Sequence, residues 1–440
     1  MIAEALRTLR QSPPRPAHFG RVLSATGLVI EATGLEAAIG EMCTIRPDTR
    51  TGAPVSAQVI GIRGEAALLM PLGEAAGLRA GSLVERGTRE HAVAVGDGLL
   101  GRVVDGAGQP IDGLGPLRLA ESRAVRAAPP APLDRQLIDA PLSTGVRAID
   151  GLLTMAKGQR VGIFAGSGVG KSTLLGTIAA RSEADVNVIA LIGERGREVR
   201  EFVHDTLGPE VLARSVVVAV TGDQAALARV NGALVATAIA EHFRDAGKDV
   251  LLMMDSVTRV AQAQREIGLA AGEPPTTRGY TPSVFALLPR ILERAGPGAV
   301  GTITGLFTVL VDGGDLDEPI ADAVRGILDG HIVLSRKLAD SGHFPAIDVP
   351  ASVSRVMPRV TTEAHQQAAR DARALIADYR DVEPLVRVGA FASGQDPAAD
   401  RAVALQPALT AFLRQGPDEA ADDVAAALAA LVARSLPVVA

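Results

Sequence analysis

A glycine-rich turn stands between the apolar run at 161–164 and a stretch with helical periodicity. Its residues are Ala165, Gly166, Ser167, Gly168, Val169, Gly170, Lys171, Ser172 and Thr173. The glycines let backbone N–H groups converge on an anion, and a helix that starts after Gly170 adds the positive end of its dipole. At this spacing Lys171 reaches the β- and γ-phosphates of a nucleotide, and Ser172 ligates Mg²⁺. We predict that residues 166–173 bind a nucleoside triphosphate. The strict pattern has glycine at the position of Ala165.

Two acidic residues follow other apolar runs. Asp255 ends the run at 250–254, and Glu194 comes just after the run at 186–192. The carboxyl ends of buried parallel strands meet at one edge of a sheet, where such sheets bind ligands. We expect Asp255 to hold Mg²⁺, and Glu194 to orient the attacking water and accept its proton. Glu198 is expected to hold the water shell of the metal; a solvated charged turn is the alternative for this segment.

The composition of the 440 residues restricts the class of protein. Hydrophobic residues make up 47% and charged residues 21% of the chain, which allows packed cores and excludes general disorder. A net charge of −6, 2% aromatic residues and no tryptophan argue against a nucleic-acid-binding surface. The single cysteine, Cys43, excludes an intrachain disulfide and fits a reducing cytoplasm. No apolar stretch is long enough to span a membrane, so we expect a cytoplasmic protein with at most peripheral membrane contact.

Changes in pattern along the chain predict four segments: 1–19, 20–95, 96–350 (with a junction and linker at 96–134) and 351–440. The first is expected to be a docking segment, because residues 1–12 carry an apolar stripe at helical spacing that suits a partner or a lipid surface; a frayed terminus is the alternative. The second contains short β-strands separated by glycine-bearing turns, which fits a small β-barrel. The third contains the glycine-rich turn and both acidic residues. The fourth is rich in alanine and has helical periodicity.

Apolar runs alternate with helical patterns across the third segment. The runs lie at 161–164, 186–192, 216–220, 250–254 and 300–311, and a long helical pattern covers 224–244. Short continuous apolar runs are typical of strands buried on both faces, which occur in parallel sheets with crossover helices. The fold class is therefore predicted as α/β, with an N-terminal β-barrel and a central P-loop domain. C-terminal helices are predicted at 363–379, 397–415 and 418–434.

Several longer sequence segments resemble a known protein family. They lie at 101–105, 193–195, 265–275, 283–290, 329–337 and 345–348. Together with the glycine-rich turn, they resemble the hexameric ATPases related to the catalytic subunit of rotary ATP synthases. Within that group the resemblance is greatest to the flagellar and type III secretion export ATPases. It covers about residues 20–435, and nucleotide binding alone does not explain these strings.

This resemblance implies a RecA-like central domain, ATP as substrate, Mg²⁺ as cofactor, and a homohexameric ring with nucleotide sites between subunits. The segment 352–355 resembles the arginine-finger segment of the family. Arg355 is therefore expected to stabilise charge on the γ-phosphate in the site of the neighbouring subunit, a contribution of roughly 10³–10⁵ in rate. Noncatalytic subunits of rotary synthases have glutamine at the position that resembles Glu194, so the resemblance implies a catalytic subunit.

The base pocket departs from the family pattern. The rotary enzyme has a tyrosine near the position aligned with Gln366, and Phe412 aligns near another aromatic residue of that pocket. We therefore expect Phe412 to bind nucleotide and adenine stacking to be weaker than in the rotary enzyme. Packing of Phe412 within a helical core is the alternative.

The resemblance also implies partners. The segment 266–277 resembles a loop that faces the central pore of export ATPases, and residues 1–12 occupy the place where a regulatory, stator-like protein docks. Further expected partners are a stalk-like protein, the export gate, and exported proteins or their chaperones. The expected location is the cytoplasmic side of the inner-membrane export apparatus. No nucleic-acid partner is expected.

Four alternatives to a flagellar export ATPase remain open: a virulence secretion ATPase, the catalytic subunit of a rotary ATP synthase, an RNA-translocating hexamer, and a nonhydrolytic scaffold. Residues 203–218 resemble the flagellar export ATPases more than the virulence secretion ATPases. RNA translocation requires aromatic and basic residues in the N-terminal domain, whereas residues 20–95 contain no aromatic residue. A rotary subunit would co-purify with a noncatalytic paralogue, and a scaffold would support export without hydrolysis.

Overall fold

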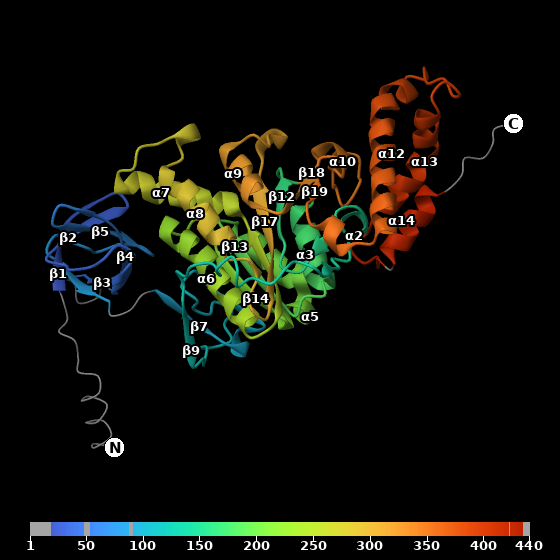
Figure 1. The fold of residues 1–440 in the computed structure, drawn as a ribbon. Helices are drawn as coiled ribbons and strands as arrows, with labels where there is room; N and C mark the ends of the chain where they lie inside the picture. Colours follow the sequence, from blue (N-terminus) through green and yellow to red (C-terminus); the bar gives the residue numbers. More distant parts are fainter. Residues whose placement is uncertain (1–18, 48–52, 88–90, 422, 434–440) are drawn as a thin grey trace.

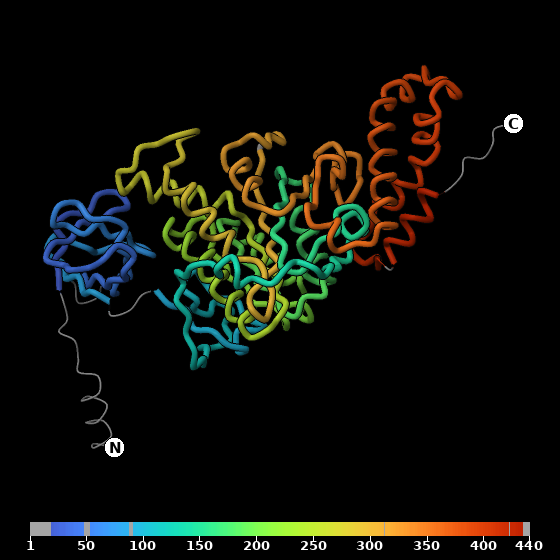
Figure 2. The backbone as a smooth tube through the Cα atoms, viewed as in Figure 1, coloured from blue at the N-terminus to red at the C-terminus, as the bar shows by residue number. Residues whose placement is uncertain are grey.

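The computed structural model describes residues 19–47, 53–87, 91–421 and 423–433. Three parts follow one another along an elongated molecule: a β-barrel, a large sheet covered by helices, and a group of helices (Figure 1). The backbone trace shows the barrel and the C-terminal helices at opposite ends (Figure 2). The expected fold class is therefore confirmed, whereas the docking helix expected in residues 1–12 lies outside the described residues.

Six antiparallel strands form a closed barrel in the order β1-β2-β5-β4-β3-β6. They are β1 (Phe19–Thr26), β2 (Val29–Thr33), β3 (Met42–Arg46), β4 (Val55–Arg63), β5 (Ala66–Pro71) and β6 (Leu83–Arg86). Alternate side chains of each strand point inward, so Ile30, Ile45 and Leu69 form a core together with Cys43. Burial raises the pKa of the Cys43 thiol to about 11, and this residue acts as a small apolar side chain.

The segment after the barrel joins it to the central sheet. Strand β7 (Ala92–Val95) pairs with β9 (Glu121–Ala124) rather than with the barrel, although it falls within the range 20–95 assigned to the barrel. Strand β8 (Arg102–Val104) forms an edge of the central sheet. The Arg102 guanidinium donates to both oxygens of Asp112, at 2.7 and 2.9 Å, and thereby holds the pKa of Asp112 well below its usual range. This ion pair fixes the loop beyond β8.

The central sheet has the strand order β19-β18-β12-β17-β15-β13-β14-β8. Its strands are β12 (Arg160–Ala165), β13 (Val186–Ile192), β14 (Ser215–Val220), β15 (Asp249–Asp255), β17 (Thr302–Leu310), β18 (Gly330–Leu334) and β19 (Val353–Ser354), with β16 (Gly296–Pro297) beside β17. All pairs are parallel except those made by β16 and β19. The five predicted apolar runs are confirmed as strands. The sequence did not predict β8, β18 and β19, which are short and include polar residues such as His331.

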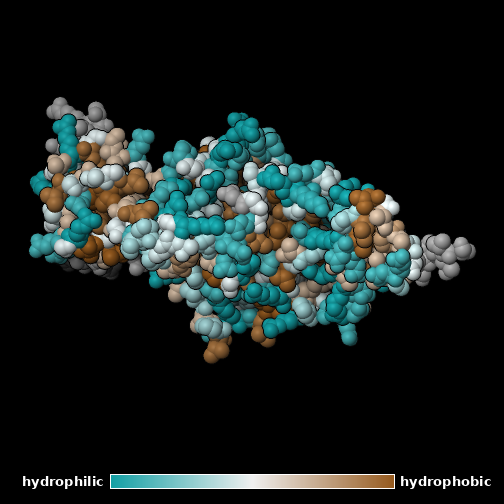
Figure 3. Space-filling view, turned by 90° about the horizontal axis from the view of Figure 1, so that it is seen from above, coloured by the Kyte–Doolittle hydropathy of each residue, from teal (hydrophilic) through white to brown (hydrophobic). Residues whose placement is uncertain are grey.

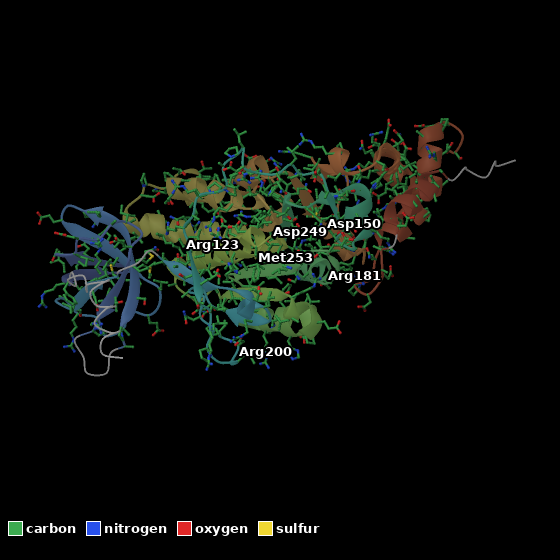
Figure 4. The ribbon with its side chains drawn as sticks, turned by 60° about the horizontal axis from the view of Figure 1, so that its bottom comes forward. Arg123, Asp150, Arg181, Arg200, Asp249 and Met253 are labelled. Carbon is green, nitrogen blue, oxygen red and sulfur yellow. The ribbon has the colours of Figure 1, made fainter. Side chains whose placement is uncertain are left out.

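The sheet buries a hydrophobic core on each face, because successive side chains of a strand point to opposite sides. In β15, Leu252 and Met254 pack on one face, whereas Leu251 and Met253 pack on the other. Helices α6 (Ala226–Asp245), α7 (Val257–Ala271), α8 (Pro282–Leu292) and α9 (Pro319–Ile327) cover the first face. Helices α2 (Arg147–Leu152) and α3 (Lys171–Arg181) cover the second face. Figure 4 labels Met253 and, at the other end of β15, Asp249.

Shorter elements complete the central part. They are the 3₁₀ turns Asp97–Leu99, Thr277–Gly279 and Asp312–Gly314, the hairpin strands β10 (Pro141–Leu142) and β11 (Met155–Ala156), helix α4 (Gly196–Glu201), the π-helical turn Phe202–Leu207, and helices α5 (Gly208–Ala213) and α10 (Arg336–Asp340).

The C-terminal helices differ from the prediction at their ends. They are α11 (Met357–Val360), α12 (Glu363–Arg387), α13 (Pro397–Leu413) and α14 (Val424–Val432). Helix α12 continues past residue 379 and contains Pro384 in its last turn. Helix α14 begins later than residue 418, because the Asp423 carboxylate caps it by accepting the N–H of Ala426 at 3.3 Å. Their apolar faces pack against α2 and share the second core of the sheet.

Within the described ranges, none of the helices combines the length and the apolar character that a membrane span requires.

A buried ion pair holds α6 to the segment after α8. The side chains of Glu241 and Arg294 are each 1% exposed, and the guanidinium donates to both carboxylate oxygens at 2.8 Å. Arg294 also donates to the carbonyl of Val125 at 2.8 Å. Glu241 accepts a further bond at 3.1 Å from Arg123 of β9, which Figure 4 labels on the side of the central part nearer the barrel. The pair therefore ties the junction segment to the central part.

Replacing Glu241 by glutamine is expected to destabilise the central part by about 3–5 kcal/mol, because the Arg294 charge stays buried without its main countercharge. The free energy of unfolding in urea measures this loss. The matched control is Glu85→Gln, which removes an exposed ion pair with Arg46 and should cost about 1 kcal/mol or less. Equal losses in the two variants would contradict the prediction.

Candidate active site

The phosphate loop lies at the carboxyl end of β12, between β18 and β17. Ala165 is the last residue of β12 and pairs in register with Leu310. Alanine is tolerated at this position because a strand residue needs no left-handed backbone. Gly168 and Gly170 have φ angles of +74° and +86°, which favour glycine, and helix α3 then begins at Lys171.

The loop faces solvent rather than a packed core. The exposed residues are Ser167, Gly168, Ser172 and Thr173, whereas Val169 is buried and anchors the loop in the second core. The N–H groups at the start of α3 have no acceptors within the helix. This arrangement leaves an accessible, positively polarised hollow at the carboxyl end of the sheet.

The side chain of Lys171 lies between two carboxylates. Its Nζ is 2.5 Å from Oδ1 of Asp255 and 3.5 Å from Oε1 of Glu194. Asp255 ends β15 and is 4% exposed, and the hydroxyl of Thr308 on the adjacent β17 donates to its Oδ1 at 2.7 Å. Glu194 follows β13, the neighbour of β15 on the other side. Neighbouring strand ends thus bring these three charged groups together.

Glu194 and Glu198 have opposite pKa shifts. Burial raises the pKa of Glu194 to about 7; the Lys171 ammonium opposes this rise, and the negative charge of Asp255 adds to it. The pKa of Glu198 is lowered by its hydrogen bond with Glu194, and then by its bond with Arg195, whose guanidinium lies 3.0 Å away. A carboxyl with a pKa near 7 can accept a proton at neutral pH.

The oxygen atoms of Ser172 and Asp255 fit a magnesium ion bound mainly through nucleotide. Mg²⁺ in such sites keeps several waters and uses one or two carboxylates together with phosphate oxygens. In the described part of the chain, no group of three or more His, Cys, Asp or Glu side chains could hold a metal ion by itself. The exposed hydroxyl of Ser172 and the single carboxylate of Asp255 are the donor set expected for Mg²⁺ with a triphosphate.

A cavity of about 320 Å³ opens beside the phosphate loop. Its lining is mainly apolar and consists of Val146, Gly170, Thr173, Leu174, Thr177, Phe344, Pro345, Gln415, Gly416 and Pro417. Ring carbons of Phe344 lie 3.3 Å from the point where a Cβ on Gly170 would stand, and Phe344 is 45% exposed. The volume and the exposed ring suit a purine stacked on Phe344.

Asp150 of α2 holds the segment that carries Val146 into the lining of this cavity. Its carboxylate accepts the N–H groups of Thr144 and Gly145, each at 2.9 Å, and the hydroxyl of Thr144 at 2.6 Å. The amide of Gln415, in the loop after α13, donates to the carbonyl of Gly145 at 2.8 Å. Figure 4 shows Asp150 on the side of the central part nearer the C-terminal helices. These bonds fix the segment that ends in Val146, which lines the cavity.

Two residues expected at the base pocket lie elsewhere. Phe412 does not line the cavity; the end of its ring is 3.5 Å from the Cβ position of Gly151, where it packs between α13 and α2. The Gln366 amide donates to two backbone carbonyls of its own segment, both at 3.0 Å. Phe344, which the sequence analysis did not assign to the base pocket, lies beside the loop instead. The signal was its place immediately before the family string at 345–348.

Arg259 is a site residue that sequence reasoning missed. It lies on the first turn of α7, just after Asp255, and its side-chain carbons approach to 2.8 Å the point where a Cβ on Gly193 would stand. Its buried Nε has no partner among the described residues, and Nη1 donates to Gln262 at 3.3 Å. A guanidinium therefore lies beneath the turn that carries Glu194. The spacing of one helical turn after Asp255 was the available signal.

Arg355 lies near the amino ends of β12 and β18, whereas the phosphate loop lies at the carboxyl end of β12. It follows β19, whose Ser354 pairs with Gly330 at the start of β18, and Gly330 is in register with Val161 at the start of β12. Gly166 comes five residues after Val161, which corresponds to about 16 Å along a strand. The exposed Arg355 donates through Nη1 to a backbone carbonyl of the loop before β18 at 3.2 Å. Its guanidinium is remote from the phosphate loop of its own chain.

The doubly covered parallel sheet, the phosphate loop and the carboxylates at its carboxyl edge define a P-loop ATPase. Three family models match the chain: the beta-barrel domain of the ATP synthase alpha/beta family at residues 22–87, the nucleotide-binding domain of that family at 145–354, and the T3SS EscN ATPase C-terminal domain at 361–433.

Curated relatives and solved structures agree with these matches. The flagellum-specific ATP synthase of Bacillus subtilis is 55% identical over 92% of each chain. The type 3 secretion system ATPase of Xanthomonas euvesicatoria is 51% identical over 91% of this chain and 90% of its own. The assembled ATPase EscN in complex with its central stalk EscO, from enteropathogenic E. coli, aligns with a TM-score of 0.87 and 47% identity, covering 94% of this chain and 100% of that one. The chain therefore belongs to the ATP synthase alpha/beta family, within the flagellum-specific and type 3 secretion ATPases.

Replacing Phe344 by alanine is expected to weaken nucleotide binding by about 1–3 kcal/mol, the usual contribution of one base stacked on an aromatic ring. Titration with a fluorescent ATP analogue measures the affinity. Phe344→Tyr should keep most of it because the ring face is retained. Phe412→Leu is the matched control, since Phe412 lies in the helical core. A greater loss of affinity in Phe412→Leu than in Phe344→Ala would contradict this assignment.

Glu194 should make stability depend on pH in nucleotide-free protein. In the unfolded chain this carboxyl ionises above its ordinary pKa of 4.5, whereas in the folded protein it ionises only near 7. Its burial therefore costs stability progressively as the pH rises between these values. Glu194→Gln should be more stable than wild type at pH 8 by about 1–3 kcal/mol, and the gain should shrink towards pH 4.5. Thermal unfolding across this range tests it; a pH-independent difference would contradict it.

Proposed function

We propose that the chain hydrolyses ATP in a homohexameric ring, at sites completed between neighbouring subunits, and that hydrolysis supports protein export through a flagellar type III secretion apparatus. The observation that carries this proposal is the placement of the charged groups. Lys171, Asp255 and Glu194 lie at the carboxyl ends of the strands, and Arg355 lies exposed near their amino ends.

In the proposed reaction, the loop N–H groups and Lys171 bind the β- and γ-phosphates, and Lys171 exchanges its contact with Asp255 for phosphate oxygens. Asp255 and Ser172 would hold Mg²⁺, with Glu198 contacting its water shell. The metal would supply positive charge to the β- and γ-phosphate oxygens. Glu194 orients the attacking water and accepts its proton while the bond between the γ-phosphorus and the bridging oxygen breaks, which yields ADP and inorganic phosphate.

Two guanidinium groups are assigned to the charge that develops on the γ-phosphate. Arg259 lies beneath the Glu194 turn of the same subunit, and Arg355 is supplied by the neighbour. A planar guanidinium fork matches phosphate oxygens, and fingers of this kind contribute roughly 10³–10⁵ in rate. Phe344 provides the stacking surface for the adenine ring.

The surface of the barrel supports assembly into a ring. Its exposed large apolar residues are Phe19, Leu23, Leu28, Ile39 and Ile62, at 46%, 56%, 49%, 65% and 55% exposure. Figure 3 shows hydrophobic residues gathered over the barrel, whereas hydrophilic residues predominate over the central part. Exposed apolar residues gathered on one part of a protein are typical of protein interfaces. Contact between neighbouring barrels would cover it, and the related EscN is described as assembled.

The proposed partners follow from the family. The solved EscN complex contains a central stalk, EscO, so we assign a stalk-like protein to the pore of this ring, facing the segment 266–277. A stator-like regulator at residues 1–12, the export gate, and exported proteins or their chaperones complete the set. The proposed location is the cytoplasmic side of the inner-membrane export apparatus, with peripheral attachment.

The flagellar assignment within the family is supported by residues 203–218 and by similarity to flagellum-specific relatives. The flagellar enzyme of Bacillus subtilis shares 55% identity and the secretion ATPase of Xanthomonas euvesicatoria shares 51%. Neighbouring genes for flagellar basal-body proteins would support this assignment, and neighbouring virulence genes would contradict it.

Mixing two inactive variants tests the shared site. Lys171→Ala should abolish ATPase activity because the phosphates lose their cation, and Arg355→Ala should lower it by about 10³-fold or more. In rings assembled from equal amounts of both, about a quarter of the interfaces combine an intact Lys171 with an intact Arg355, so a corresponding fraction of activity should return. No recovery in verified mixed rings would contradict action of Arg355 in the neighbour's site.

Two variants without hydrolysis, Lys171→Ala and Glu194→Gln, distinguish an ATPase that drives export from a nonhydrolytic scaffold. A strain whose only copy carries Lys171→Ala or Glu194→Gln should fail to export flagellar proteins. Wild-type export in both strains, with purified variants that lack ATPase activity, would favour the scaffold.

A further inference from the structure

Arg336 is a second cation beside the phosphate loop, on a segment not yet assigned to the site. It is the first residue of α10 and follows β18, the neighbour of β12. Its Nη2 donates to the carbonyl of Ser167 at 2.7 Å. The same nitrogen lies 3.5 Å from the point where a Cβ on Gly166 would stand. The guanidinium therefore lies directly against the first turn of the loop.

The carbonyl that Arg336 binds belongs to the peptide unit that joins Ser167 to Gly168. In a planar trans peptide, the C=O and N–H groups point in opposite directions. A bond that holds the Ser167 carbonyl towards Arg336 therefore turns the N–H of Gly168 away from Arg336. Gly168 has a φ of +74°, and its N–H finds no acceptor among the described residues. This donor is available to an anion in the hollow of the loop.

We propose that Arg336 is a positioning residue for phosphate binding, which orients and polarises the Ser167–Gly168 peptide so that the Gly168 N–H donates to a nucleotide phosphate. A cation on the carbonyl oxygen draws electron density from the N–H end and makes it a better donor. The ligand feature recognised is the di- or triphosphate group and not the base. The inference rests on the proposed function, because it concerns the same loop.

Helix α10 is held in place independently of the phosphate loop. The N–H of Ser335 donates to the carbonyl of Ala346 at 2.8 Å, which closes the segment that carries α10. Lys337, the next residue after Arg336, forms an ion pair with Glu383 of α12 at 3.2 Å. Arg336 and Lys337 are both exposed, yet one contacts the phosphate loop and the other contacts a C-terminal helix. Lys337 is therefore a matched control for the loss of one cation from α10.

Equilibrium binding of Mg-ATP and Mg-ADP to the full chain tests the proposal. Arg336→Ala should raise the Kd of both nucleotides about 5- to 10-fold, a loss smaller than that of a buried charged hydrogen bond because the pair is exposed. The kcat at saturating ATP and the preference for ATP over GTP should stay near the wild-type values. Arg336→Lys should restore part of the affinity, since it keeps the charge without the planar fork. Lys337→Ala should bind both nucleotides as wild type does.

Three results would overturn the proposal. The first is wild-type affinity in Arg336→Ala. The second is a fall in kcat at unchanged Kd, which would make Arg336 part of the chemistry. The third is an equal loss of affinity in Lys337→Ala, which would assign the effect to the position of α10. Failure of the wild-type chain to bind ATP would overturn the proposed function together with this inference, whereas the first three results leave the proposed function intact.

Discussion

The contact between Lys171 and Asp255 is the interaction on which the rest of the site depends. An ammonium group and a carboxylate that is 4% exposed lie 2.5 Å apart, so each supplies the countercharge that makes burial of the other tolerable. Phosphate oxygens compete for the same ammonium. In the proposed reaction, nucleotide binding would therefore withdraw Lys171 from Asp255 and leave that carboxylate able to ligate a cation. The raised pKa of Glu194 has a related origin, because burial favours the neutral carboxyl and the negative charge of Asp255 adds to this effect, while the Lys171 ammonium opposes it.

The sheet separates the charged groups into two sets. Lys171, the carboxylates and Arg259 lie at the carboxyl ends of the strands. Strand β19 places Arg355 beside the start of β18, at the amino ends of the strands. One arginine side chain cannot span the length of β12, so Lys171 and Arg355 of the same subunit cannot contact the same phosphate. A head-to-tail ring removes this conflict, since such an interface brings different surfaces of identical subunits together. The apolar outside of the barrel fits the same arrangement.

The segment that carries α10 and Phe344 connects the phosphate loop to the C-terminal helices. Arg336 and Phe344 contact the loop, while Lys337 pairs with α12 and the Phe344 carbonyl accepts the N–H of Gln415 at 2.9 Å. Residues from the central sheet and from the helical part thus build one wall of the cavity jointly. Any displacement of the C-terminal helices would therefore move the surface that we propose for purine stacking.

The sequence by itself determined five strands of the central sheet and the phosphate loop, because continuous apolar runs and a glycine pattern follow from local chemistry. The run at 186–192 is β13 residue for residue, and the carboxylates at 194 and 255 follow from their place after such runs. The base pocket was decided by tertiary structure alone. Phe412 and Phe344 are both aromatic residues near apolar neighbours, and only the packing of α13 against α2 places one in a core and the other beside Gly170. Contacts between segments distant in sequence leave no local pattern, so the contact of Arg336 with the Ser167 carbonyl is evident only in the folded chain.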